Sequence, residues 1–112
     1  MTTKRSSSRA KRTKSSTIQF FEELNGGPLT FGQMLSCIRM CDEESQTNFA
    51  KKLGVSKAHL CDIEKGRRTV SLARAYSWGR KLGYSPELFV ELAIQTGLDH
   101  DRLPFKVKLV AA

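Results

Sequence analysis

Apolar residues recur at helical spacing in the stretch that follows residue 29. Within FGQMLSCIRM they fall three or four positions apart and share one face, the pattern of a helix that packs against a core. Thr30 lies just before this stretch, and Gln33 follows Thr30 by three positions. This is the spacing of a capping box at a helix N-terminus. The pattern predicts a first helix whose apolar stripe consists of Phe31, Met34, Leu35 and Ile38.

Serine and glycine mark the ends of four further segments, which cover residues 45–54, 56–66, 71–83 and 85–97. Each begins with a serine, whose hydroxyl can cap the free amides of a helix N-terminus, and ends with a glycine, which can adopt the left-handed conformation that ends a helix. Pro86 occupies the first helical position of the last segment, where its missing N–H does no harm. Five successive helices predict an all-α domain over residues 30–98.

The segments on either side of this domain carry weaker patterns. Residues 18–29 form a lead-in with a short apolar-rich piece, IQFFEEL, which predicts one or two helical turns packed on the domain. In the C-terminal extension, residues 99–112, Phe105, Val107 and Leu109 alternate with two lysines, as in a short β-strand with one apolar face. Because a lone strand is not stable, we expect its partner to be the same segment of a second copy or a different protein.

The formal net charge of +8 is concentrated in the first 17 residues. This segment holds six of the 19 basic residues, whereas all 11 acidic residues follow it. Because it contains almost no apolar side chains, we expect a disordered basic arm over residues 1–17. Such an arm is either a solubilising tail or a contact with phosphates or a minor groove that carries no sequence preference. Its basic residues are Lys4, Arg5, Arg9, Lys11, Arg12 and Lys14.

Several classes of protein are disfavoured by the sequence. No apolar run follows the basic arm as in a secretory signal, and no stretch has the length of a membrane span, so we expect a cytoplasmic protein without a membrane partner. Cys37, Cys41 and Cys61 are an odd number without paired metal-site spacing, which favours reduced thiols over a zinc site. No nucleophilic triad or pair of catalytic carboxylates stands out. We therefore expect no enzyme, no metal and no cofactor.

Residues 45–66, SQTNFAKKLGVSKAHLCDIEKG, contain two helices joined by a very short connection. Such a connection turns the chain sharply and forces the two helices to cross steeply. On a wheel of the second helix, residues 56–65, Leu60, Ile63 and Glu64 share one side, whereas Ala58 and Asp62 point the other way together with Lys65. This helix thus has a packed side and a free side, and the major groove of DNA is wide enough to admit it.

From about residue 30 to residue 82 the chain resembles the Cro/repressor (Xre) family of helix-turn-helix proteins. The resemblance implies a five-helix, lambda-repressor-like fold that binds double-stranded DNA and reads the major groove with residues 56–65. The pattern of the family, from the glutamine that opens the first helix of the motif to the glycine that follows the second, is met by Gln46, Ala50, Gly54, Val55, Ser56, Leu60, Glu64 and Gly66.

The resemblance also implies roles for individual residues. Those that face base edges are Lys57, Ala58, His59 and Asp62. Those that contact phosphates or position the reading helix are Gln46, Ser56, Lys65, Arg67 and Arg68. Arg39 and Glu64 match a structural ion pair between the first helix and the reading helix.

Two of these positions also have ordinary surface interpretations. Asp62 could accept a hydrogen bond from cytosine N4, or it could form a solvated pair with Lys65, three positions further on. His59 could reach a base edge or a phosphate, or it could be an ordinary exposed histidine. Asp62 departs most from expectation, because a carboxylate that faces DNA is repelled by phosphates unless it finds a donor.

These observations predict a sequence-specific transcriptional regulator that represses its target as a homodimer on an inverted repeat. The dimer contact would come from the fifth helix, through Leu88, Phe89, Leu92 and Ala93, or from pairing of residues 105–110. The alternative is an antitoxin of a type II toxin-antitoxin pair, which represses its own operon and binds a toxin. A nuclease would need a carboxylate cluster that is not evident, and the deep, narrow groove of A-form RNA would exclude the reading helix.

Overall fold

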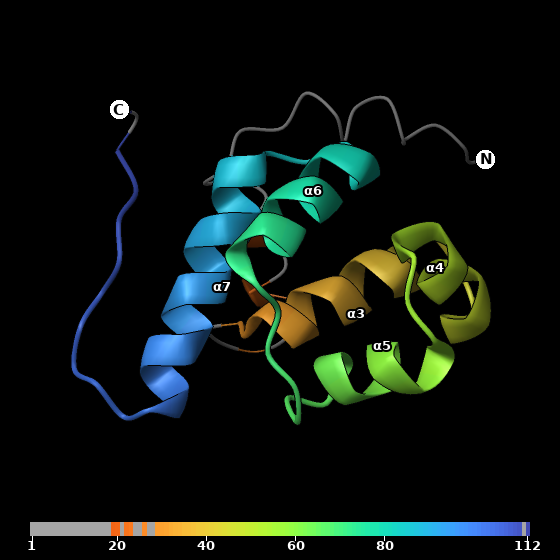
Figure 1. The fold of residues 1–112 in the computed structure, drawn as a ribbon, viewed down its shortest axis with the longest axis horizontal. Coiled ribbons are helices and arrows are strands. Elements are labelled where there is room, and N and C mark those ends of the chain that lie inside the picture. The colour runs from red at the N-terminus through yellow and green to blue at the C-terminus, as the bar shows by residue number, and fades with distance from the viewer. Residues whose placement is uncertain (1–18, 21, 24–25, 27–28, 111) are drawn as a thin grey trace.

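The structure is a computed structural model that describes residues 19–20, 22–23, 26, 29–110 and 112. The basic arm expected over residues 1–17 therefore lies outside the described residues. The fold is all-α, as the sequence pattern predicts, and Figure 1 shows α3 at its centre, between α5 below it and α6 above it. The helices are α3 (Phe31–Cys41), α4 (Gln46–Leu53), α5 (Lys57–Glu64), α6 (Leu72–Leu82) and α7 (Pro86–His100).

The predicted N-terminal caps are confirmed. Thr30 Oγ1 accepts a hydrogen bond from Gln33 N at 3.1 Å, and Gln33 Oε1 accepts one from Thr30 N at 3.0 Å, which completes the capping box of α3. A serine hydroxyl caps each later helix by accepting from the amide three positions on. Each helix therefore begins where one short side chain satisfies a free amide. The capping serines are Ser45, Ser56, Ser71 and Ser85.

The predicted end of the fifth helix at Gly97 is wrong. The helix α7 continues to His100, and Gly97 is an ordinary helical residue whose carbonyl accepts a hydrogen bond from Asp101 N at 3.0 Å. A glycine inside a helix costs about 1 kcal/mol relative to alanine but does not oblige the helix to stop. Thr96 Oγ1, one residue earlier, accepts from Phe31 N at 2.8 Å and anchors this part of α7 to the start of α3.

The core is formed by side chains from all five helices. Phe31 at the start of α3 packs between aromatic rings of α6 and α7, with ring centroids 6.5 Å from Trp78 and 5.7 Å from Phe89. Trp78 is only 2% exposed, and its Nε1–H donates to the carbonyl of Leu53 at 3.1 Å. That hydrogen bond ties α6 to the end of α4. Trp78 is thus a core residue, not a platform for stacking bases.

A close approach of α3 to the end of α5 sets the position of α5. Gly32 in the first turn of α3 is buried, and a Cβ atom built on it would lie only 2.0 Å from the carbonyl oxygen of Ile63. No residue larger than glycine fits there without moving one of the two helices. The fold therefore uses a glycine to place α5 directly against α3.

The C-terminal extension is not a strand in the described part of the chain. Residues 103–110 run back beside α7 (Figure 1) and bond to its side chains. Gln95 Oε1 accepts from Val107 N at 2.8 Å, Gln95 Nε2 donates to the carbonyl of Phe105 at 2.9 Å, and Glu91 Oε1 accepts from Leu109 N at 3.3 Å. Because these side chains satisfy one edge of the extended segment, it needs no second strand to stay in place.

Helical backbone is also found at residues 19–20 and 22–23 of the lead-in, and Gly26 N donates to the carbonyl of Glu22 at 2.9 Å. No helix in the described residues is long and apolar enough to cross a membrane.

Candidate nucleic-acid interface

The helices α4 and α5 form a compact unit with a sharp turn between them. Gly54 ends α4 in the left-handed conformation, with φ of 81°, and Val55 N donates to the carbonyl of Ala50 at 3.0 Å. Two residues later Ser56 caps α5 by accepting from His59 N at 3.0 Å. The sequence thus turns the chain sharply within a few residues, because one glycine and one serine satisfy the backbone on both sides of the turn.

One side of α5 is locked into the core. Leu60 is 0% exposed and Ile63 2% exposed, and both belong to the main apolar cluster. On the opposite side Lys57 and Ala58 are exposed, and His59 and Asp62 are half-buried. No described segment of the chain covers this outward side. The structure therefore brings the four base-facing candidates onto one accessible surface.

The phosphate-contact candidates lie around this surface in different settings. Ser56 precedes the helix and uses its side-chain oxygen as the cap. Lys65, Arg67 and Arg68 follow the helix and are exposed. Gln46, at the start of α4, is half-buried because its side chain is engaged within the protein.

A polar network joins α3, α4 and α5 behind the reading surface. Arg39 donates through Nε to Glu64 Oε2 at 2.8 Å and through Nη2 to Glu64 Oε1 at 3.1 Å, which is the ion pair that the resemblance implied. Gln46 Nε2 donates to the same Oε1 atom at 3.0 Å, and Arg39 Nη1 donates to the carbonyl of Glu44 at 3.2 Å. The Glu64 side chain is only 5% exposed, so its charge depends on these partners.

Asp62 has a different partner from the one expected. Its Oδ1 atom accepts from Arg67 Nε at 3.1 Å and lies 3.0 Å from Arg67 Nη2, and no contact with Lys65 is found among the described residues. Two cationic candidates that looked equivalent in the sequence are therefore not equivalent. Arg67 is engaged by a carboxylate of the reading helix, whereas Lys65 has no such partner.

Arg74, in the first turn of α6, is a member of this surface that the sequence analysis did not identify. Partial burial lowers the pKa of His59, and the charges of Arg68 and Arg74 lower it further, against an opposing effect of Asp62. The Arg74 guanidinium carbon lies 5.7 Å from the centre of the Trp78 ring. The positive charge of Arg74 thus disfavours protonation of a residue of α5, although Arg74 follows the end of that helix by ten positions. Arg74 could have been identified from the sequence by its position, because it lies one helical turn after the N-cap residue Ser71.

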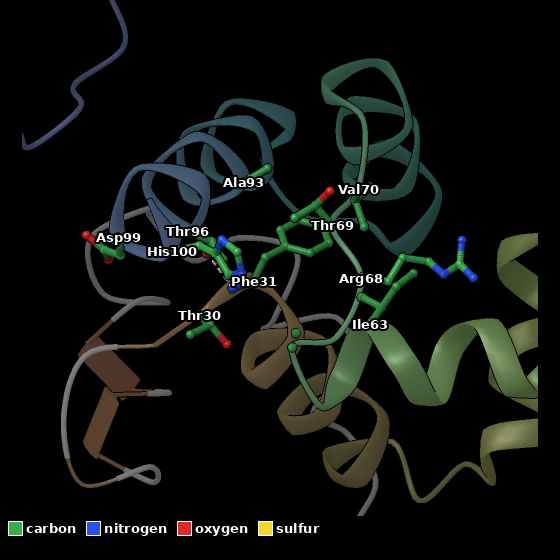
Figure 2. A pocket seen from close by; sticks show the side chains of 12 residues that line it. Thr30, Phe31, Ile63, Arg68, Thr69, Val70, Ala93, Thr96, Asp99 and His100 are labelled. Atoms are coloured by element: carbon green, nitrogen blue, oxygen red, sulfur yellow. Dashed lines mark hydrogen bonds between the residues drawn. The ribbon is translucent and has the colours of Figure 1, made fainter. Parts of the chain in front are cut away.

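A pocket of about 280 Å³ lies beside this surface, between the start of α3, the end of α5 and the second half of α7. Figure 2 shows Phe31 and His100 among the side chains that line it, while the Arg68 guanidinium points away. None of the four base-facing candidates lines it. The pocket is therefore separate from the reading surface.

The part of the chain that the structure describes gives little support for a metal site or for a reactive thiol. No cluster of three or more histidine, cysteine or acidic side chains is placed to hold a metal ion there. The three cysteines are reduced thiols and partly buried. Burial raises the pKa of Cys37, and the neighbouring Cys41 raises it further, so this thiol is protonated at neutral pH.

Comparison with known proteins gives one match. Residues 45–89 match a family model described as helix-turn-helix, which spans α4, α5, α6 and the beginning of α7. No curated protein and no solved structure matches the chain. Arg39 and the rest of α3 lie outside the matched residues.

Proposed function

Since residues 45–89 form a DNA-binding helix-turn-helix domain of the Cro/repressor (Xre) type, we propose that the protein is a sequence-specific transcriptional repressor that reads the major groove with α5. The observation that carries this proposal is the division of α5 into two sides. Its inner side is held by the core and by the Arg39–Glu64 pair, and its outer side is free and flanked by cations. A rigid helix with an accessible polar side suits base readout, because discrimination requires defined positions of the donors and acceptors.

The proposal assigns different tasks to the exposed residues. Lys57 donates to guanine O6 or N7, Ala58 packs on a thymine methyl group, and His59 reaches a base edge or a phosphate. Around them Lys65, Arg68 and the amide end of α5 at Ser56 contact phosphates and set the register on the duplex. Gln46 braces the reading helix through Glu64, and the proposal assigns to the same amide a contact with the DNA backbone.

Selection of bound sites from a random DNA pool tests this function directly. We expect one preferred motif of a few base pairs, repeated with inverted symmetry. Binding of all duplexes with equal affinity, or of none at low ionic strength, contradicts the proposal. Addition of magnesium should yield no cleavage of the bound DNA, since the proposed function is binding alone.

We assign the dimer contact to α7, but not to the residues that the sequence suggested. Leu88 and Phe89 are 2% and 0% exposed and belong to the core, so they are not available to a second copy. Ile94 and Leu98, four positions apart, are partly exposed and lie on the side of α7 opposite to Leu88 and Phe89. Two copies joined there would present two reading helices, as an inverted repeat with half-sites about 34 Å apart requires.

Pairing of residues 105–110 with the same segment of a second copy is less favourable. The antiparallel registers centred on residues 106, 107 and 108 keep the apolar faces together but place Lys106 or Lys108 opposite another lysine, and like charges in that position are destabilising. Lysines on a free strand edge are a common protection against such pairing.

The variant Ile94→Asp tests the α7 assignment. We expect a monomer at micromolar concentration and loss of the preference for a palindrome over a single half-site, whereas Lys106→Asp as a surface control keeps the dimer. A wild-type protein that is monomeric and binds one half-site as tightly as a palindrome contradicts a dimer altogether.

A second candidate function is that of an antitoxin. The observation that favours it is the exposure of two apolar side chains of the extended C-terminal segment, Phe105 at 59% and Val110 at 86%. Such a segment could add to the edge of a partner protein. Co-expression with the product of the neighbouring gene tests this candidate: a stable complex that requires residues 103–112 supports it, and separate purification of the two proteins contradicts it.

A further inference from the structure

A carboxylate on the reading helix is an unusual feature of a DNA-binding surface. Asp62 lies in the last turns of α5, with a side chain that is 35% exposed. Near DNA a lone carboxylate is repelled by the phosphates, so it weakens binding unless its charge is compensated. The structure supplies compensation from Arg67.

The turn that follows α5 places Arg67 beside Asp62. Gly66 is left-handed, with φ of 81°, and its N–H donates to the carbonyl of Ile63 at 3.1 Å. The N–H of Arg67 donates to the carbonyl of Asp62 at 2.8 Å. This pair of hydrogen bonds is a Schellman motif, which folds the chain back over the last helical turn. The pairing of the two side chains is thus prepared by the backbone.

The geometry of the ion pair leaves half of the carboxylate available. Both contacts from Arg67, through Nε at 3.1 Å and Nη2 at 3.0 Å, reach Oδ1. No contact of Oδ2 is found among the described residues. Asp62 therefore presents a neutralised carboxylate with one free acceptor on the outward side of α5.

We propose that Arg67 is a specificity-determining positioning residue, which orients and neutralises Asp62 so that its free oxygen accepts a hydrogen bond from the amino group N4 of cytosine. Arg67 is then not a phosphate anchor, although its charge and its place after the reading helix suggest one. The inference depends on the proposed DNA-binding function and adds the source of base preference at one position. Cytosine presents its amino donor alone in the major groove, whereas adenine places the N7 acceptor beside its amino group, where it would repel a carboxylate.

The test combines site selection with the salt dependence of binding, using the full chain. Wild type is compared with Asp62→Ala, Arg67→Ala, the double variant, and Arg68→Ala as a matched control that removes a neighbouring arginine. We expect Asp62→Ala and Arg67→Ala to lose the preference for cytosine at the same base pair, by about five- to hundredfold in discrimination. The double variant should lose no more than either single variant, because the two residues act as one unit.

Salt dependence separates pairing from phosphate contact. Removal of both Arg67 and Asp62 should leave the slope of log K against log salt unchanged, because their charges cancel. Removal of Asp62 should steepen the slope by about 1, because the released Arg67 can then reach a phosphate, whereas Arg68→Ala should flatten it by about 1. Circular dichroism and thermal unfolding verify that each variant is folded.

Two results overturn the inference while the proposed function survives. One is an equal loss of affinity in Arg67→Ala over all sequences with the preference for cytosine retained, which would make Arg67 a phosphate anchor. The other is that the wild-type protein prefers adenine, or no base, at the base pair where Asp62→Ala changes the selection. By contrast, failure of the wild-type protein to select any sequence rejects the proposed function itself.

Discussion

Lys57 projects from the first turn of α5, and no ion pair of its ammonium group is found among the described residues. Since it is free to donate to a base, Lys57→Ala should weaken binding to the selected site by about 1–3 kcal/mol and relax preference at one base pair. Quantitative binding to the selected site and its single-base variants measures both effects. Lys81→Ala, in the last turn of α6, is the control. An equal loss on all sequences would make Lys57 a phosphate contact.

Arg39 holds the reading helix through its ion pair with Glu64. Arg39→Ala removes the main partner of the nearly buried Glu64 carboxylate and should lower the free energy of unfolding by about 3 kcal/mol or more. Chemical denaturation measures this loss. Lys52→Ala, which removes a 2.5 Å ion pair with Glu44 at a more exposed place, should cost only about 0–1 kcal/mol. Normal stability of Arg39→Ala together with lost binding would mean that Arg39 contacts DNA instead.

His59 reports on the charge around the reading helix. Its pKa lies below the ordinary histidine value of 6.5, through burial first and then through Arg68 and Arg74. The folded protein thus binds the proton less readily than the unfolded chain, so this residue lowers stability as the pH falls through and below 6.5. In an NMR titration, Arg74→Ala should move the midpoint of His59 upward. An unmoved midpoint would place Arg74 away from the reading surface.

At the scale of helices, the contact between α3 and α5 gives the sharpest test. Gly32→Ala would place a methyl group 2.0 Å from the Ile63 carbonyl oxygen. We expect destabilisation of about 1–3 kcal/mol and weaker DNA binding, because α5 must shift. Gly97→Ala is the matched control: it lies within α7 with nothing within 4 Å of the added atom, so it should be neutral or stabilising by up to about 1 kcal/mol. Equal effects of the two changes would contradict this packing.

The starts and the ends of the helices differ in how well the sequence predicts them. The starts of α3 to α7 were found from the sequence, because a cap is a local hydrogen bond between residues three positions apart. Helix ends were less certain, since a glycine permits termination without requiring it. Gly54 and Gly83 do end their helices, whereas α7 passes through Gly97.

For the whole molecule, the uneven distribution of charge leads to a test of the arm. Six basic residues lie within the first 17, so deletion of residues 1–16 should flatten the salt dependence of DNA binding with little change in base preference. Filter binding at several salt concentrations, with the wild-type chain in parallel, measures the slope. An unchanged slope would mean that the arm does not contact DNA.

The composition of the candidate site was only partly predictable. The reading helix and its outward residues followed from periodicity and from the resemblance, because a single helix decides which residues share a side. The pairing of Asp62 with Arg67 and the approach of Arg74 to His59 did not, since they depend on the turn after α5 and on the packing of α6. The core burial of Leu88 and Phe89 likewise depends on how α7 lies against α3 and α6.

By itself the sequence determined where helices begin, which of their sides are apolar and which helix presents polar residues outward. Those properties depend on residues within one or two turns of each other, whose interactions are set by helical geometry alone. Only the tertiary structure decided which charges are neutralised, which apolar residues of α7 remain for a partner and where the C-terminal extension lies. These outcomes are set by contacts between segments distant in sequence, or across a turn, and they form only when the helices pack into one arrangement.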